Sequence, residues 1–228
     1  MTIFEQLEQH SNAFINILDS ELSLSNETHS FPWQNIVYEG NNVRRAHLDI
    51  VDKREEKKLF MMHLCIFPEK YSSFPIYGFD LIAGPKKVTG AFHDISPGAD
   101  PNHIMMSWFK GQTAGFEWSK PRELPEWARQ IFSSSMIAAG NIKDSMELNE
   151  VLTFSLFTLR YYLHRLKNDE FSSQINSVDA QNKYCYYQKQ NPHTPRVMQS
   201  LGFDKDTVDE FIQTCLFPEI ENGYIQAT

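Results

Sequence analysis

Two polar residues interrupt apolar stretches of the sequence and are the first candidates for chemistry. His63 lies within the apolar run of residues 59–67, and Asp80 lies within the apolar run of residues 76–84. A lone buried carboxylate costs on the order of several kcal/mol unless it keeps its proton. A buried histidine beside a buried aspartate can share a proton, as acid–base catalysis requires. The alternative is two separate polar groups of the core, each satisfied by its own hydrogen bonds.

His47 and Asp49 form a second pair of candidates. They are two positions apart in a stretch that alternates as a half-buried strand does, so both side chains point to one face. If this strand pairs with residues 59–67 in a suitable register, His47, Asp49 and His63 face a common cavity. The register decides the matter, because a shift by one residue moves every side chain to the opposite face.

Motifs for a resident cofactor are missing from the sequence. It contains no metal-ligand spacing, Walker loop, nucleophile elbow or dinucleotide-binding glycine motif. It therefore carries no signature of a nicotinamide, flavin or iron–sulfur group, and we expect no permanently bound cofactor and no metal. If the protein does redox chemistry, the electrons come from a separate carrier and the reducible group is the ligand.

Composition and charge narrow the class of protein. Of 228 residues, 41% are apolar and 22% charged, as in ordinary soluble domains, and 13% are aromatic, which suits a large core or a flat hydrophobic ligand. The net charge of −8 argues against binding to nucleic acid. The basic clusters are either solvated loop charges or a docking face for a small acidic partner. They are Lys53-Arg54 with Lys57-Lys58, Lys86-Lys87, and Lys120 with Arg122.

Cysteine usage and hydropathy indicate the compartment. Cys65, Cys185 and Cys215 are far apart and odd in number, so they predict neither a disulfide framework nor a metal site, and a reducing cytoplasm is expected. No stretch is long and apolar enough for a membrane span, and the N-terminal residues lack the features of a signal peptide. We therefore expect neither secretion nor membrane insertion.

The elements that must position these residues follow from periodicity and turn signals. Residues 3–22 have apolar side chains at helical intervals, and polar residues 23–30 predict a loop. Four strands are predicted, with a charged turn at 52–58 between the first two: 43–51, 59–67, 76–84 and 88–95. Helices are predicted at 125–135, 145–166, 174–188, from 194 to about 202, and 205–217.

This order of elements predicts the fold class. Strands in the middle of the chain with helices on both sides predict an α/β protein, with an antiparallel sheet sandwiched by helices. No repeat, low-complexity tract or linker divides the chain, so one domain should span residues 1–228.

Several of these segments resemble one enzyme family, the ferredoxin-dependent bilin reductases, and within it the phycocyanobilin:ferredoxin oxidoreductase branch. The resemblance rests on the order and spacing of the segments and covers the chain from about residue 47 to 217. The matching segments are His63-Leu-Cys-Ile-Phe-Pro-Glu, Phe74-Pro-Ile-Tyr-Gly-Phe-Asp-Leu-Ile-Ala-Gly-Pro, Val88-Thr-Gly-Ala-Phe-His-Asp-Ile-Ser-Pro, Arg122-Glu-Leu-Pro-Glu-Trp with Ile131-Phe-Ser, Tyr184-Cys, and Gln190-Asn191 with Thr194.

The resemblance implies a fold and an activity. The fold is a three-layer α/β/α sandwich with a central antiparallel sheet, in which biliverdin lies between the sheet and the C-terminal helices. The implied reaction is the reduction of biliverdin IXα by single electrons from reduced ferredoxin, through radical intermediates and with protonation, and without flavin, metal or nicotinamide. The implied protein is a cytoplasmic monomer that works on biliverdin and ferredoxin.

The resemblance also implies roles for individual residues. Asp80 matches the family's central aspartate, which binds the bilin nitrogens or lactam and passes protons to them. His63 shares a proton with it or with a lactam oxygen, and His47 matches a histidine near an end ring. The substrate-binding positions implied by the match are Thr89, where the branch has a serine near a propionate, and Lys189, Gln190 and Asn191 near the C-terminus.

One departure from the branch bears on the product. Asp49 falls where phycocyanobilin-forming enzymes carry a glutamate implicated in protonating the D-ring vinyl group. A side chain shorter by one carbon withdraws the carboxylate by about 1.5 Å, and proton transfer requires hydrogen-bond reach. The expected product is therefore phycoerythrobilin, with phycocyanobilin as the alternative.

Two functions of other classes stay open at this point. One is a bilin carrier that binds the pigment without reducing it, which would need the cavity but no buried acid pair. The other is a protein with an apolar pocket for an unrelated ligand. The pairing of His63 with Asp80 favours the enzyme over the carrier. A green or blue complex with biliverdin would argue against the second.

Overall fold

A seven-stranded antiparallel sheet forms the centre of the protein, and each strand pairs with the next one in the chain. The structure is a computed structural model, and it describes residues 1–40, 42–168 and 175–220. The strands are β1 (Ser23–Leu24), β2 (Gln34–Gly40), β3 (Val43–Lys53), β4 (Leu59–Pro68), β5 (Ile76–Gly84), β6 (Lys87–Ser96) and β7 (Ile137–Ile142).

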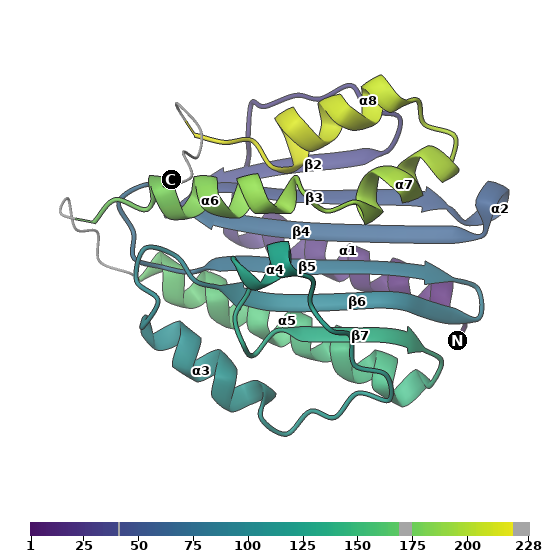
Figure 1. The fold of residues 1–228 in the computed structure, drawn as a ribbon, viewed down its shortest axis with the longest axis horizontal. Helices are drawn as coiled ribbons and strands as arrows, with labels where there is room; N and C mark the ends of the chain where they lie inside the picture. Colours follow the sequence, from purple (N-terminus) through teal and green to yellow (C-terminus); the bar gives the residue numbers. More distant parts are fainter. Residues whose placement is uncertain (41, 169–174, 221–228) are drawn as a thin grey trace.

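Helices cover both faces of this sheet, so the protein has three layers (Figure 1). In the view of Figure 1, α1 and α5 lie behind the sheet, and α4, α6 and α7 lie in front of it. The helices are α1 (Ile3–Glu21), α2 (Arg54–Lys57), α3 (Ile104–Thr113), α4 (Glu126–Arg129), α5 (Ser145–Lys167), α6 (Val178–Gln188), α7 (His193–Ser200) and α8 (Lys205–Glu210), which continues as the π-helix η1 (Phe211–Leu216). This confirms the predicted α/β/α sandwich.

The rear layer holds the larger hydrophobic core. Helix α1 begins with a capping box, in which the Thr2 hydroxyl accepts from the Glu5 backbone and the Glu5 carboxylate accepts from the Thr2 backbone. Its apolar side packs with α5 against every second residue of the strands, among them Leu64 and Leu81. Because side chains alternate along a strand, the residues between these point to the front layer.

The front layer packs on the other sheet face through a second core. Helices α6 to α8 and η1 bury apolar side chains against β3, β4 and β5, including Phe211 and Leu216 against Val51 and Met61. This packing is less continuous than that of the rear layer, because a cavity lies between the sheet and the helices.

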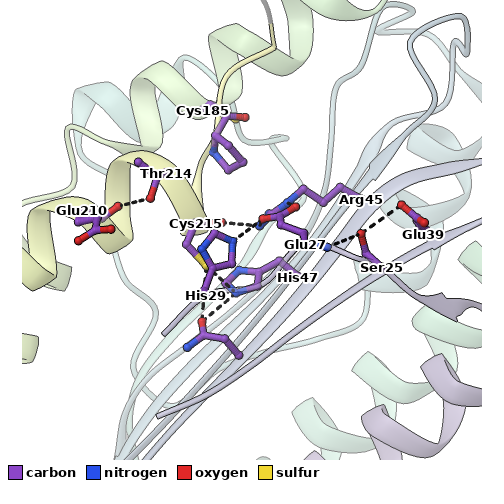
Figure 2. Close-up of polar contacts among 12 residues, drawn as sticks. Ser25, Glu27, His29, Glu39, Arg45, His47, Cys185, Glu210, Thr214 and Cys215 are labelled. Carbon is purple, nitrogen blue, oxygen red and sulfur yellow. Dashed lines mark hydrogen bonds and ion pairs between the residues drawn. The ribbon is translucent and has the colours of Figure 1, made fainter. Parts of the chain in front are cut away.

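A buried arginine ties three distant segments together at one side of the front layer (Figure 2). The Arg45 guanidinium on β3 donates to both carboxylate oxygens of Glu27 at 2.9 and 2.6 Å and to the Cys215 carbonyl on η1 at 2.7 Å. Glu27 also contacts the His29 ring at 2.5 Å. The segment before β2 and the C-terminal π-helix are therefore both held to β3.

The structure differs from the predicted elements in several places. Strands β1, β2 and β7 and helix α3 were not predicted, and the turn at 52–58 contains the short helix α2. The helix predicted at 125–135 is a single turn, α4, and the one predicted at 205–217 changes to a π-helix at Phe211. Helix α6 begins at Val178, and residue 174 of its predicted start lies outside the described residues.

Within residues 1–40, 42–168 and 175–220, no helix is both long enough and apolar enough to cross a lipid bilayer.

Candidate active site

The register of the sheet brings three of the predicted residues into one row. Asp49 on β3 pairs directly with His63 on β4, and His63 pairs directly with Asp80 on β5. Directly paired residues of antiparallel strands point to the same face, with their Cβ atoms about 4.5–5.5 Å apart. All three side chains therefore face the front layer, and the expected meeting of His63 with Asp80 on one face agrees with this register.

A cavity of about 370 Å³ lies over this row, between the sheet and the front helices. Its volume is within the range typical of small-molecule sites. Asp49, His63 and Asp80 line the sheet side, and the rest of its lining is mainly apolar and aromatic: it includes Met61, Phe92, Trp127, Phe132, Phe211 and Phe217. The cavity thus joins a flat hydrophobic surface to a row of acid–base groups.

A glycine on the sheet, Gly78, creates part of this space because it has no side chain. Gly78 lies beside Asp94 in the row next to Asp80, and a Cβ added at Gly78 would come within 3.2 Å of the Tyr184 hydroxyl oxygen. That contact is tight, because it leaves the ring of Tyr184 little room to move. A larger residue at position 78 would therefore push α6 away from the floor of the cavity.

Asp80 keeps its proton to a higher pH than an exposed aspartate does. Burial raises the pKa of its carboxyl group to about 6, against a smaller lowering by His63 and with a further raising by Asp49. Its side chain is partly accessible, and it lines the cavity, so a ligand can reach it. A carboxylic acid with a pKa near the working pH is an efficient proton donor.

His63 lies between the two carboxylates of the row. Its Nδ1 is 3.4 Å from Asp49 Oδ1, which is within ion-pair distance but without hydrogen-bond alignment, since neither atom has a hydrogen bond within the described part of the chain. The edge of its ring meets the Phe217 ring at 5.6 Å between centroids. The imidazole is therefore held by packing and leaves polar atoms for a ligand.

His47 points to the same sheet face but does not line the cavity. Its Nε2 lies 3.1 Å from Asn35 Oδ1 and 3.4 Å from Cys215 Sγ, and η1 covers it (Figure 2). Burial, with Arg45 nearby, holds the pKa of His47 well below its usual range, so the ring is neutral. The expectation that His47, Asp49 and His63 share a cavity is thus wrong for His47, because the C-terminal π-helix fills that end.

Three buried polar atoms of this group lack a partner within the described residues: His47 Nδ1, Asp49 Oδ1 and His63 Nδ1. The same side chains each offer one ligand atom, and these atoms lie within 4.8 Å of one another. Buried polar atoms are normally hydrogen-bonded. A polar group of a ligand, or a cation, would satisfy them.

Two of the four predicted substrate-binding residues line the cavity. Thr89 and Asn191 do so, with Thr89 donating to the Ile82 carbonyl at 3.0 Å and Asn191 donating to Thr194 at 3.2 Å. Lys189 and Gln190 do not line it. Lys189 instead donates to Glu219 at 2.8 Å, and Gln190 is exposed, because both follow the end of α6 on its outer side.

A further carboxylate in the cavity wall, Asp94 on β6, was not predicted from the sequence. It is buried, and it accepts hydrogen bonds from the Ser133 backbone and hydroxyl and from the Ser96 hydroxyl. Burial raises the pKa of Asp94 to about 6, although these hydrogen bonds oppose the shift. The sequence feature that could have indicated Asp94 is its position within an apolar strand, two residues after Phe92 and therefore on the same face of the sheet.

Comparison with protein families decides what this site belongs to. The family model described as ferredoxin-dependent bilin reductase matches residues 3–218. The chain belongs to this family. A ferredoxin-dependent bilin reductase is an enzyme, and ferredoxin supplies its electrons, so a protein that only carries a pigment is excluded.

Individual relatives agree with this assignment. The bilin reductase is 31% identical over 191 residues to a phycocyanobilin:ferredoxin oxidoreductase of Synechococcus sp. (strain CC9902), covering 80% of this chain and 74% of the relative. It is 24% identical to the protein of the same name from Prochlorococcus marinus (strain MIT 9515), covering 95% and 92% of the two chains.

Solved structures share the fold. The structure of a protein named PcyX has a TM-score of 0.69 and 32% identity, covering 94% of this bilin reductase and 99% of that chain. Tomato phytochromobilin synthase, solved in complex with biliverdin, has a TM-score of 0.75 at 14% identity, covering 94% and 82%. The latter likeness concerns the fold alone.

Proposed function

We propose that this bilin reductase converts biliverdin IXα to phycoerythrobilin, with phycocyanobilin as the alternative product. Four electrons arrive singly from reduced ferredoxin, and four protons balance them, so that radical bilin intermediates form between transfers. The observation that supports this most is the row Asp49, His63 and Asp80 on the floor of an aromatic-lined cavity.

Asp80 is the proposed proton donor to the tetrapyrrole. Adding an electron to a conjugated π system raises its basicity, so an acid in contact with it must then supply a proton. The carboxyl group of Asp80, with its pKa raised to about 6, keeps that proton to a higher pH than an exposed aspartate does, and a minor fraction stays protonated at neutrality. His63 lies directly beside it in the register and is proposed to share or return the proton.

Asp49 and His47 have more limited proposed roles. Asp49 lines the cavity on the side of His63 away from Asp80, where it can act on an end ring of the pigment. His47 is neutral and covered by η1, so its proposed role is to position Asp49 and His63. Thr89 and Asn191 are proposed substrate contacts, since both line the cavity, whereas Lys189 and Gln190 are withdrawn from that role.

The product depends on the reach of Asp49. Its carboxylate is about 1.5 Å shorter than that of a glutamate at this position, which takes the D-ring vinyl group out of hydrogen-bond reach. Protonation at the C15–C16 methine bridge then replaces reduction of the vinyl group, and phycoerythrobilin results.

Anaerobic turnover of biliverdin with reduced ferredoxin, followed by chromatography of the product, tests the proposal. We expect a phycoerythrobilin peak from the wild-type enzyme and a shift towards phycocyanobilin from Asp49→Glu. A phycocyanobilin peak from the wild type would reject the proposed product, and unchanged biliverdin would reject the substrate. The Asp206→Asn variant, on the exposed surface of α8, controls for a change of one carboxylate elsewhere.

The setting of the enzyme is part of the same proposal. We place it in the cytoplasm as a monomer, with one catalytic domain over residues 1–228. Cys65, Cys185 and Cys215 are free and buried thiols, as a reducing compartment allows. The family model matches residues 3–218 as one stretch, which supports a single domain. Gel filtration with light scattering measures the oligomeric state.

A further inference from the structure

Two imidazoles and a carboxylate converge at the β3 end of the cavity without satisfying one another. His47 and Asp49 point to the same sheet face from one strand, and Asp49 pairs directly with His63 on the next. His47 Nδ1, Asp49 Oδ1 and His63 Nδ1 are buried without a hydrogen-bond partner in the part of the chain that the structure describes. Such a group of unsatisfied atoms calls for a shared occupant.

The pigment cannot be the occupant that all three share. Asp49 and His63 line the cavity, so a polar group of a bound pigment can reach them. His47 is fully buried and does not line the cavity, because η1 covers it. A small ion that enters through the cavity can instead lie among the three side chains, each of which offers a ligand atom within 4.8 Å of the others.

The neighbours of His47 prepare it to bind such an ion. Asn35 donates through Nδ2 to the Trp33 carbonyl at 3.2 Å, so its Oδ1 faces His47 Nε2 at 3.1 Å (Figure 2). An amide oxygen only accepts, so Nε2 carries the hydrogen, and Nδ1 of the neutral ring presents a lone pair. Metal-bound histidines are oriented in this way, by donating from the ring nitrogen that does not bind the metal.

We propose that His47, Asp49 and His63 form an exchangeable Zn²⁺ site, and that the ion inhibits the enzyme by competing with the pigment. Two imidazoles and one carboxylate are typical zinc ligands, at about 2.0–2.2 Å from the ion, and three protein ligands leave one position open. Small side-chain rotations bring atoms that lie within 4.8 Å of one another to that distance. The open position faces the cavity, since Asp49 and His63 line it. The inhibition rests on the proposed function, whereas the binding of the metal does not.

Calorimetric titration of the pigment-free enzyme with Zn²⁺ tests the site, and absorption bands of Co²⁺ report its coordination. We expect the wild type to bind one ion. Asn35→Ala keeps all three ligands and removes the acceptor that orients His47, so it should bind Zn²⁺ about 10- to 100-fold more weakly. Asp49→Asn removes a ligand and should lose more than that. His164→Gln, an exposed histidine on α5 behind the sheet, is the matched control and should leave the affinity unchanged.

Two results would overturn the site. One is a wild-type enzyme that binds no Zn²⁺. The other is an affinity in Asn35→Ala equal to that in His164→Gln, which would place the bound ion elsewhere. Because Asn35→Ala retains every ligand, this comparison holds even where Asp49→Asn fails to fold.

Competition is measured as a difference between two proteins, because the nitrogens of a free bilin also bind Zn²⁺. At a Zn²⁺ concentration of about 100 times its wild-type Kd, biliverdin binding should weaken by about 100-fold in the wild type. In Asn35→Ala the same concentration should weaken it by about tenfold or less. Equal weakening in both proteins would overturn the inhibition. Failure of the metal-free wild type to bind biliverdin would instead overturn the proposed function, and Zn²⁺ binding would still be measurable.

Discussion

At the scale of single residues, the chemistry depends on where a proton resides before an electron arrives. Asp80 keeps its proton to higher pH than an exposed aspartate does, because burial disfavours its charge. Replacing it by asparagine preserves the shape and removes the acid. The effect of this change on pigment binding can therefore be measured separately from its effect on turnover.

For Asp80→Asn, we expect biliverdin to bind while turnover falls by about 100-fold or more, the contribution typical of a general acid. A bilin radical should accumulate, because electrons still arrive without the matching proton. Anaerobic single-turnover absorbance and electron paramagnetic resonance measure both effects. Wild-type turnover in this variant would remove Asp80 from the role of proton donor.

The pH dependence of turnover follows from the same group. With a folded pKa of about 6, Asp80 is protonated below that pH and loses its proton as the pH rises through it. The turnover rate should therefore fall above about pH 6, approaching tenfold per pH unit. Asp94 also has a pKa of about 6, so the profile of Asp94→Asn identifies the group responsible: the fall should persist there. Its disappearance would assign the fall to Asp94.

At the scale of elements, the docking of α1 depends on a neutral histidine. His10 is buried between Phe14 and Phe79, and its Nε2 lies 3.1 Å from the Ser155 hydroxyl on α5. Burial lowers the pKa of His10 to about 3. Between this value and the ordinary pKa of about 6.5 for the unfolded chain, the unfolded state binds more protons, so stability falls as the pH falls.

Replacing His10 by phenylalanine should remove this dependence. The wild type should lose about 2 kcal/mol of unfolding free energy relative to His10→Phe when the pH changes from about 7 to about 5. Denaturant unfolding of both proteins at the two pH values measures the difference, in which the contributions of other groups cancel. A constant difference between the two proteins would show that His10 titrates normally in the fold.

The sequence predicted the elements with strong local patterns. Strands β3 to β6 are long apolar runs bounded by proline, glycine or charged turns, and α1 and α5 have a clear helical period. Strand β7 was missed because Ala138, Ala139 and Gly140 carry little strand preference. The α4 prediction was too long because the apolar residues after it pack as a loop rather than as a helix.

The site was harder to predict than the fold, for physical reasons. The row of Asp49, His63 and Asp80 requires the register, which only the pairing of the strands defines. The hydrogen bonding of the Asp94 carboxylate depends on Ser133, which is 39 positions away in the chain. Lys189 follows the end of α6 and pairs with Glu219 instead of lining the cavity, and no local sequence pattern indicates this pairing. Likewise, no local pattern indicates that η1 covers His47.

At the scale of the whole molecule, two basic clusters meet at one end of the sheet. The β3–β4 and β5–β6 turns lie at this end (Figure 1). They are close together, since a Cβ added at Gly84 would lie 3.8 Å from the Lys58 carbonyl oxygen. Lys53 and Arg54 are already paired with acidic neighbours there, whereas Lys57, Lys58 and Lys86 are exposed. Residues of the same strand ends line the cavity, among them Leu59 and Ile82.

We therefore expect ferredoxin to dock at this end, where its electrons enter close to the pigment. Reversing the charge at Lys58 and Lys86 should slow ferredoxin-dependent turnover, and the effect should be larger at low salt because screening is weaker. Turnover rates over a range of salt concentrations measure this. Arg160→Glu, exposed on α5 behind the sheet, is the control. Equal rates for the double variant and the control would place the docking face elsewhere.

The neighbour-to-neighbour pairing of the strands has a consequence for how the enzyme assembles. Asp49, His63 and Asp80 come from three consecutive strands, so two local hairpins are enough to align them. Contacts between segments close in sequence form with little loss of loop entropy. The helices that cover the cavity come from residues 178–216, more than eighty positions later. The row of acid–base groups can thus be aligned before the helices close over it, and we expect that these helices can loosen to exchange a ligand without disturbing that alignment.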